Sequence, residues 1–127
     1  MVIERRIGEK IVGSFLDIIL MSILHEKPAY GYELISVIHN AFGVLLSPGS
    51  LYPLLHVLEE KGLLESDKTD GRIFYKTSPK GEQQYKTTSD AFNTAVEHML
   101  SFIKEKPSKR EVLENLHLLQ GRDESEQ

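Results

Sequence analysis

Residues 47–56 hold a cluster of side chains that could make specific hydrogen bonds. The cluster combines small residues with hydroxyl, phenol and imidazole groups, and its members are Ser47, Gly49, Ser50, Tyr52, Pro53 and His56. Such groups hydrogen-bond to phosphate oxygens and to base edges, and small residues let the backbone approach a partner closely. The segment therefore predicts non-covalent contact with a nucleic acid.

A helix must position these side chains. Leucines at positions i, i+3, i+4 and i+7 form one buried stripe, and they are Leu51, Leu54, Leu55 and Leu58. Signals for the two ends of the helix are a cap residue, a proline in the first turn and a terminal glycine, at Ser47, Pro48 and Gly62. We therefore predict a helix over residues 47–61 that turns its leucines inward and leaves the hydrogen-bonding cluster outside.

Two short strands follow this helix. Residues 63–67 and 73–77 read as strands, and residues 68–71 between them end in Asp-Gly, a strong hairpin signal. Arg72, Lys76 and Lys80 place positive charge on the hairpin and just beyond it. A positive hairpin beside a helix suits the backbone of duplex DNA, and this order of elements is that of a winged helix.

Two helices precede the candidate recognition helix. Residues 11–25 are apolar almost all round and predict a central buried helix, which Pro28 closes. Residues 32–42 predict a second helix that ends at Gly43, and this completes the order of a helix-turn-helix. The predicted fold class is mainly α with a small β-hairpin (α+β), a winged helix-turn-helix domain over residues 1–78.

A long helix is predicted from Ser78 and Pro79 to about residue 106. Its apolar or small residues recur every three and four positions, as in a coiled-coil seam, and they are Tyr85, Thr88, Phe92, Ala95, Met99 and Phe102, with Val96, Leu100 and Ile103 beside them. The stripe could pack on the first helix or form a homodimer seam, and its length favours the dimer. A capping box at residues 108–111 starts a last short helix. The dimerisation segment therefore covers residues 79–120, and we expect a disordered polar tail over 121–127.

Four ordered motifs in this chain resemble those of the PadR family of transcriptional regulators. They are residues 30–34 (YGYEL), 47–55 (SPGSLYPLL), 58–63 (LEEKGL) and 71–76 (GRIFYK). The resemblance covers residues 14–82 closely and implies a winged-helix repressor that dimerises through its C-terminal helix and binds an inverted-repeat operator. This chain has Ile73 and Phe74 where such relatives usually carry further cations. The expected function is a sequence-specific DNA-binding repressor.

The resemblance also implies a small-molecule effector, because many such regulators respond to phenolic acids or drugs. Multidrug-responsive members place an aromatic residue near the position of Phe92 to line a cavity at the dimer centre. Phe92 and Met99 lie along the predicted seam, and Phe15 could approach them across a dimer. Binding of a small aromatic effector by these residues is a hypothesis, and a plain hydrophobic interface is the commoner use of such side chains.

The residues expected to contact DNA come from three segments of the chain. They are Tyr30, Ser47, Gly49, Ser50, Tyr52, Pro53, His56, Arg72 and Lys76. Tyr30 is expected at a phosphate, whereas Tyr32 is expected in the core.

The composition limits this interpretation. The 127 residues carry a net charge of −4, whereas DNA-binding domains usually have a basic excess. Residues 41–81 hold 5 basic and 5 acidic side chains and residues 82–127 hold 6 and 9, so the acidity lies mainly in the tail. A winged helix that binds only proteins is therefore the alternative.

The sequence lacks the residue patterns expected of thiol chemistry, metal binding, catalysis or membrane insertion. Zero cysteines exclude disulfides and thiolate chemistry, and the five histidines include no pair at metal-binding helical spacing. Glu59 and Glu60 are adjacent rather than convergent, so we expect neither an enzyme nor a cofactor. Residues 11–24, the longest apolar run, are interrupted by polar side chains, and charged residues stand near the N-terminus. We therefore expect a cytoplasmic protein with no membrane partner.

Overall fold

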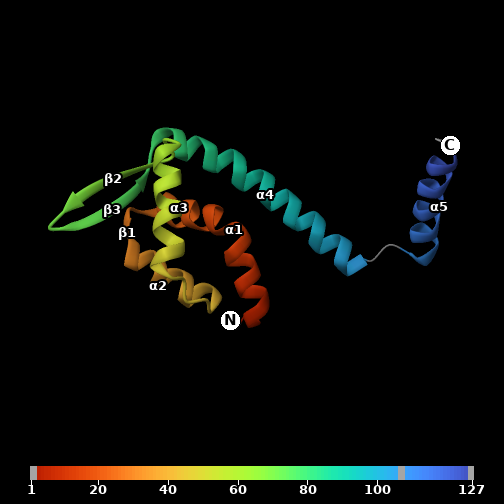
Figure 1. Ribbon diagram of the computed structural model, residues 1–127, viewed down its shortest axis with the longest axis horizontal. Helices are drawn as coiled ribbons and strands as arrows, with labels where there is room; N and C mark the ends of the chain where they lie inside the picture. Colours follow the sequence, from red (N-terminus) through yellow and green to blue (C-terminus); the bar gives the residue numbers. More distant parts are fainter. Residues whose placement is uncertain (1–2, 106–107, 126–127) are drawn as a thin grey trace. The chain divides into compact units, whose positions relative to one another are not determined.

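The computed structural model describes residues 3–105 and 108–125, which form two compact units. The first unit ends at Asp90 and the second begins at Ala91. In chain order the elements are α1 (Arg5–Glu26), β1 (Ala29–Tyr30), α2 (Gly31–Phe42), α3 (Pro48–Glu60), β2 (Leu64–Thr69), β3 (Arg72–Thr77), α4 (Pro79–Glu105) and α5 (Lys109–Ser125) (Figure 1). The division falls inside α4, whereas the sequence places the domain boundary after residue 78. The predicted class, mainly helical with a small antiparallel sheet, is confirmed.

The hydrophobic core of the first unit lies where its helices meet the sheet. Fully buried side chains come from α1, α2, α3 and β2, and the largest are Leu20, Leu24, Leu34, Ile38, Leu51, Leu55 and Leu64. Burial of each such side chain stabilises the fold by about 2 kcal/mol relative to exposure. Leu54 is half-buried against this core, so the predicted inward orientation of the α3 leucines is confirmed.

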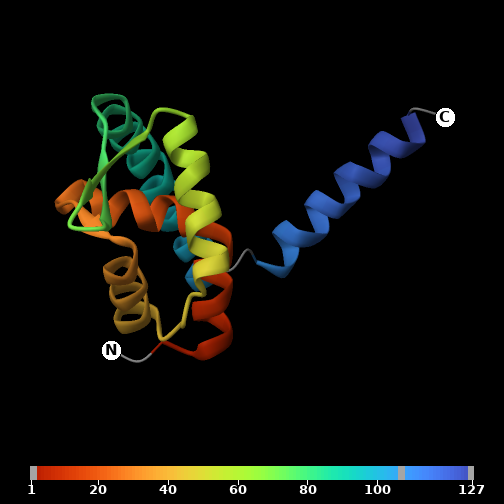
Figure 2. The same cartoon turned by 60° about the vertical axis from the view of Figure 1, so that its left-hand side comes forward.

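Helix α1 begins at Arg5, earlier than the predicted start at residue 11. The Glu4 carboxylate caps it by accepting hydrogen bonds from the backbone N–H groups of Arg6 and Ile7, at 3.1 and 3.0 Å. The helix changes direction at Phe15, where φ is −122° and ψ is 25° (Figures 1 and 2). Gly13 and Ser14 precede this point, and Gly/Ser pairs are a recognised cause of kinks. Because of the bend α1 is not buried all round, and Phe15 is 39% exposed.

Capping and glycine residues define the helix-turn-helix. The backbone N–H of Tyr30 donates to the Glu33 carboxylate at 2.9 Å, which fastens the start of α2, and Gly43 ends it with a φ of 69°. Ser47 caps α3, since its Oγ accepts from the Ser50 N–H at 3.2 Å. Gly62 follows α3 with a φ of 75°. The predicted cap and terminal glycine of α3 are therefore confirmed.

The hairpin is longer than predicted and belongs to a three-stranded sheet. Thr69 pairs with Arg72, so the turn consists of Asp70 and Gly71, whose φ values of 51° and 76° are those of a type I′ turn. Strand β1 pairs with β3 in the order β1-β3-β2. The sequence gives no signal for β1, because two residues cannot display an alternating pattern.

The first turn of α4 is fastened to the segment that follows α3. The Ser78 hydroxyl donates to the Gly62 carbonyl at 2.5 Å and accepts from the Gly81 N–H at 2.9 Å. The Ser78 N–H donates to the Leu63 carbonyl at 3.0 Å. Ser78 is therefore both the cap of α4 and the link between that helix and the core.

A carboxylate on α4 makes a second link, this time to α1. Glu82 accepts a hydrogen bond from the Thr77 hydroxyl and lies 2.6 Å from His25 Nδ1. The Thr77 hydrogen bond, followed by that of His25, lowers the pKa of Glu82 below its ordinary value of 4.5, and the His25 and Lys86 charges act in the same direction.

We expect these contacts to make stability depend on pH. Because the folded-state pKa of Glu82 is lower than the unfolded one, its contribution is present above pH 4.5 and is lost as the pH falls through the folded-state pKa. Urea unfolding between pH 7 and pH 3 should therefore show a smaller acid-induced loss of stability in Glu82→Gln than in the wild type. Glu97→Gln, at an exposed position of α4, is the control, and equal losses in all three proteins would contradict the prediction.

In the second unit, apolar side chains are exposed on both helices. On α4 they are Met99, Leu100, Phe102 and Ile103, and on α5 they are Val112, Leu113, Leu116 and Leu118. The predicted capping box of α5 is present, since the Glu111 N–H donates to Ser108 Oγ at 3.1 Å. Helix α5 continues to Ser125, past the predicted start of the tail at residue 121, although Gly121 and Asp123 have low helix propensity. No helix in residues 3–105 or 108–125 has the length and apolar character needed to cross a membrane.

Candidate nucleic-acid interface

The outward face of α3 carries the hydrogen-bonding cluster predicted from the sequence. All its members are exposed, from Ser47 and Gly49 at the start of the helix to His56 in its middle. Val57, an apolar residue outside the predicted cluster, is also exposed, at 41%. Since the leucines occupy the opposite side, this face is free to meet a partner.

Small residues form the first turn of α3. A Cβ added at Gly49 would meet only Ser47 Oγ, at 3.9 Å, so the backbone is open to close approach. The Ser47 hydroxyl donates to Ser50 Oγ at 3.1 Å. Backbone N–H groups at the start of a helix lack intrahelical acceptors and favour an anion. The geometry is suited to a phosphate oxygen near Ser50.

A groove beside α3 brings together tyrosines and an arginine. It has a volume of about 500 Å³ and is lined by Tyr30, Gly31, Tyr32, Tyr52, Gly71, Arg72 and Ile73, which we call the tyrosine–arginine groove. The Arg72 guanidinium lies 5.5 Å from the ring centre of Tyr30 and 5.8 Å from that of Tyr32, and it donates to the Tyr32 hydroxyl at 3.4 Å. Stacking on two rings holds the cation beside the turn of the hairpin.

Tyr32 was expected in the core, and this prediction is wrong. Its side chain is 56% exposed and stacks on Tyr30, with ring centres 5.7 Å apart. Leu34 and Ile38 set the buried face of α2, and Tyr32 lies more than a third of a turn away from that face around the helix. The spacing of those two residues could have placed Tyr32 outside.

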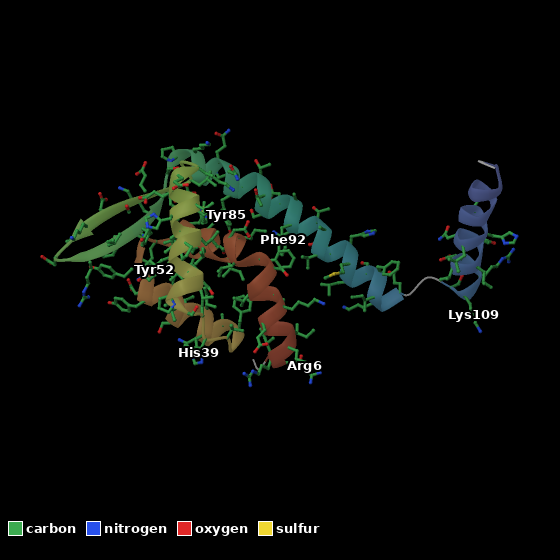
Figure 3. The ribbon with its side chains drawn as sticks, viewed as in Figure 1. Arg6, His39, Tyr52, Tyr85, Phe92 and Lys109 are labelled. Carbon is green, nitrogen blue, oxygen red and sulfur yellow. The ribbon has the colours of Figure 1, made fainter. Side chains whose placement is uncertain are left out.

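Gly31 is required by the position of Tyr52. A Cβ at residue 31 would lie 2.3 Å from the Tyr52 hydroxyl oxygen, so the phenol can rest there only because residue 31 is glycine. This contact links α3 to the groove and orients the Tyr52 ring. Figure 3 labels the Tyr52 side chain on α3. Both tyrosines predicted to contact DNA, Tyr30 and Tyr52, therefore lie with Arg72 on one surface.

The hairpin cations have different surroundings. Lys76 Nζ lies 3.5 Å from the Asp67 carboxylate and 3.8 Å from that of Glu65, both on the neighbouring strand. Lys80 Nζ donates to the Lys61 carbonyl at 2.9 Å. Within the described ranges no carboxylate forms an ion pair with Arg72. Of the cations predicted to contact DNA, Arg72 therefore has the charge that is not paired with a carboxylate, and Lys68 on β2 is a further exposed hairpin cation.

The acidic residues late in α3 also differ. The Glu59 carboxylate accepts a hydrogen bond from the Ser66 hydroxyl and so is turned toward β2. Burial raises the pKa of Tyr75, and the negative charge of Glu59 and the phenol of Tyr52 add to the effect. Glu60 is exposed. Glu60 therefore opposes the approach of a polyanion along the exposed face of α3, whereas the Glu59 charge is held on the side of β2.

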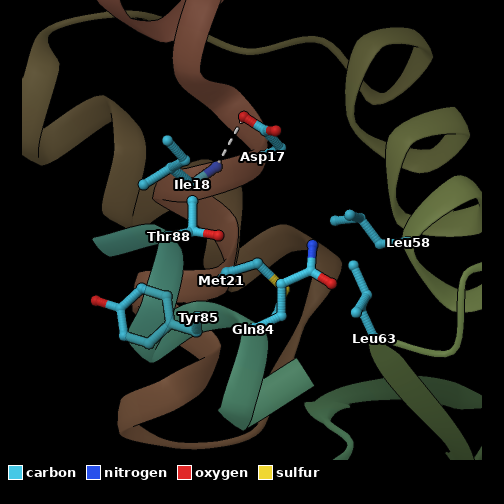
Figure 4. Close-up of a pocket in the computed structure, with 8 residues that line it drawn as sticks. All are labelled: Asp17, Ile18, Met21, Leu58, Leu63, Gln84, Tyr85 and Thr88. Atoms are coloured by element: carbon cyan, nitrogen blue, oxygen red, sulfur yellow. Dashed lines mark hydrogen bonds between the residues drawn. The ribbon is translucent and has the colours of Figure 1, made fainter. Parts of the chain in front are cut away.

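A second pocket lies between α1, the end of α3 and the start of α4 (Figure 4). It has a volume of about 50 Å³ and is lined by Asp17, Ile18, Met21, Leu58, Leu63, Gln84, Tyr85 and Thr88. Sites for drug-sized ligands enclose roughly 300–1,000 Å³, so this pocket is too small for a planar aromatic compound. Neither pocket is lined by Phe15, Phe92 or Met99. In the part of the chain that is described, no His, Cys, Asp and Glu side chains gather to hold a metal ion.

Two residues of the predicted seam pack inside the first unit. Tyr85 lies against the hydrophobic core and its ring centre is 4.8 Å from that of His25, and Thr88 is half-buried. The other seam residues lie beyond Asp90. Phe92 and Val96 are half-buried, whereas Ala95, Met99, Phe102 and Ile103 are exposed.

Comparison with known proteins relates this chain to a group of transcription factors. Residues 19–87 match the family model described as the transcriptional regulator PadR-like family. The chain is 36% identical over 91 residues to the transcriptional activator GvpE of Haloferax mediterranei, covering 71% of this chain and 47% of that protein. The transcriptional activator GvpE1 of Halobacterium salinarum is 39% identical over 77 residues, or 59% of this chain and 40% of the relative. The chain thus spans less than half the length of these relatives.

Solved structures agree with the fold. A PadR family regulator from Eggerthella lenta has a TM-score of 0.65 and 25% identity, over 84% of this chain and 90% of that one. A PadR family regulator from Clostridium difficile has a TM-score of 0.63 and 25% identity, over 70% and 98%. These similarities confirm the predicted winged-helix fold.

Proposed function

The chain belongs to the PadR-like family of transcriptional regulators, and from that premise we propose that it binds an inverted-repeat operator in duplex DNA as a homodimer. Membership of a family of regulators also confirms the expectation of a non-enzymatic function. The observation that carries the proposal is the exposed face of α3 beside the tyrosine–arginine groove. On one surface, the first unit presents an α-helix, which the major groove of DNA can admit, and Arg72, which no carboxylate of the described residues pairs with.

The interface has two parts with different tasks. Helix α3 enters the major groove, where Ser50, Pro53 and His56 face base edges and the nearest phosphate. Arg72, with Tyr30 and Tyr52, holds the phosphate backbone beside it. Lys76 contributes less, because Glu65 and Asp67 screen its charge. Half-sites should lie about 34 Å, one helical turn of DNA, apart.

The homodimer forms through the apolar stripe of α4. Phe92, Ala95, Val96, Met99, Phe102 and Ile103 repeat with the spacing of a coiled-coil seam, and Tyr85 and Thr88 begin the same stripe. Met99 and Phe102 are more than half exposed, which is costly for a chain that stays monomeric.

Phe102→Asp should convert the dimer to a monomer, because a carboxylate would lose its hydration inside an apolar seam. Light scattering should give twice the mass of one chain for the wild type and the mass of one chain for the variant. Ser101→Asp adds the same charge on the opposite side of α4 and should leave the dimer intact. Equal masses for all three proteins would contradict a seam on this face.

Repression and activation differ in where the operator lies. The sequence-based expectation is repression by steric occlusion of a promoter, whereas GvpE and GvpE1 are named activators. A reporter carrying the selected operator either within or upstream of a promoter distinguishes the two effects. Loss of expression in the first arrangement supports a repressor, and gain in the second supports an activator.

The experiment that tests the proposal is selection of bound duplexes from a random library, followed by a mobility shift at increasing salt. Enrichment of an inverted repeat with salt-dependent binding supports a DNA-binding regulator. If no sequence is retained, the alternative of a protein-interaction module takes its place. An aromatic effector on Phe15, Phe92 and Met99 stays outside the proposal, because neither described pocket is formed by them.

A further inference from the structure

Helix α3 lacks the side chains that make two hydrogen bonds to a single base. Arg and Lys bind guanine with two hydrogen bonds, and Asn and Gln bind adenine in the same way. None of these four residue types occurs between Pro48 and Glu60. Specific recognition by this helix must therefore use other contacts.

Apolar side chains occupy the positions where such residues would stand. Pro53 and Val57 are one turn apart, both are exposed, and Gly49 continues the same stripe toward the start of the helix. Leu51, Leu55 and Leu58 define the opposite, buried side. The stripe of residues 49, 53 and 57 therefore lies on the surface that faces a partner, without being needed for the core.

The backbone of the same stripe offers an acceptor. The α-helical partner of the Gly49 carbonyl would be the N–H of residue 53, which proline does not have. In the major groove an A·T pair presents an amino donor from adenine and a methyl group from thymine, whereas a C·G pair presents an amino donor but no methyl group. The Gly49 carbonyl beside apolar side chains therefore matches an A·T pair better than a C·G pair.

Resting on the proposed DNA-binding function, we infer that the stripe formed by Gly49, Pro53 and Val57 selects A·T base pairs by contact with thymine methyl groups. Burial of one methyl group changes an equilibrium constant roughly fourfold, so two such contacts in each half-site give useful discrimination. Glu60, one turn beyond Val57 and His56, would repel phosphates and keeps the reading part of the helix at its N-terminal turns.

Deoxyuridine provides the test, because it differs from thymidine only by the missing methyl group. The full chain is first used to select bound duplexes, and each thymine of the selected half-site is then replaced in turn by deoxyuridine. We expect A·T-rich half-sites, and a roughly fourfold loss of affinity at the one or two thymines that face the stripe. In Val57→Ala the loss at one of these positions should largely disappear, as in a double-mutant cycle.

Val37→Ala is the matched control, since Val37 lies on α2 and is 43% exposed against 41% for Val57. It should keep the full deoxyuridine effect. Half-sites rich in G·C, or losses unchanged in Val57→Ala, would overturn the inference and leave the DNA-binding function standing. A·T-rich half-sites without any deoxyuridine effect would also overturn it, because recognition would then be by DNA shape. Retention of no duplex would instead remove the proposed function itself.

Discussion

Gly81→Ala is expected to destabilise the first unit by about 3 kcal/mol, the largest effect that we foresee for adding a single methyl group. A Cβ at this position would lie 2.0 Å from the Leu63 carbonyl oxygen and 2.9 Å from its carbon. Both are backbone atoms, so no side-chain rotation can relieve the contact. The gain in helix propensity of alanine over glycine, about 1 kcal/mol, is too small to compensate.

The surrounding hydrogen bonds explain why the backbone cannot move aside. Leu63 accepts from the Ser78 N–H, and Ser78 Oγ bridges the Gly62 carbonyl and the Gly81 N–H. A shift of α4 large enough to admit the methyl group would break these links. The midpoint of thermal unfolding should therefore fall by roughly 10–20 °C.

Gly13→Ala is the control for this prediction. Nothing lies within 4 Å of a Cβ built at Gly13, on the exposed side of α1. Its stability should be unchanged or higher by up to about 1 kcal/mol, because alanine is the better helix former. If the two variants unfold at the same temperature, the close approach of α4 to Leu63 is not a feature of the folded protein.

Local signals determine which parts of the fold could be predicted from the sequence. Helix α3 was predictable because its cap, its terminal glycine and its leucine stripe all indicate the same element. Strand β1 was not, because its partners Phe74 and Tyr75 are more than 40 positions away and its two residues carry no pattern of their own. The early start of α1 depends on a Glu4 cap, a weaker signal than the serine or aspartate usually sought.

The sequence was sufficient to name candidate residues of the site, but it did not reveal which of them contact one another. The strand register decides which carboxylates neutralise Lys76. The two-residue turn places Glu65 directly opposite Lys76 and Asp67 on the diagonal. A longer turn over residues 68–71 would have placed Lys76 opposite the residue before β2. The contact between Tyr52 and Gly31 joins two motifs that are separate in the sequence, so no local pattern could reveal it.

Arg72→Ala should weaken DNA binding by at least about 100-fold, because a charge-assisted hydrogen bond contributes roughly 1.5–3 kcal/mol and a dimer loses two of them. The loss should be similar for all operator sequences, and the slope of log affinity against log salt should fall by about 2. Arg72→Lys should give an intermediate loss, since lysine keeps the charge but not the planar group that stacks on Tyr30 and Tyr32. Titrations of labelled operator at several salt concentrations measure these quantities.

Lys76→Ala supplies the comparison that makes the result specific to this structure. From the sequence alone Arg72 and Lys76 are equivalent hairpin cations, and both would be expected to weaken binding steeply. With Asp67 and Glu65 at 3.5 and 3.8 Å, the Lys76 charge is already partly neutralised, so its removal should cost less than about fivefold. Equal losses for the two variants would show that the cross-strand pairs do not screen Lys76, whereas full affinity in Arg72→Ala would show that the tyrosine–arginine groove lies away from the DNA backbone.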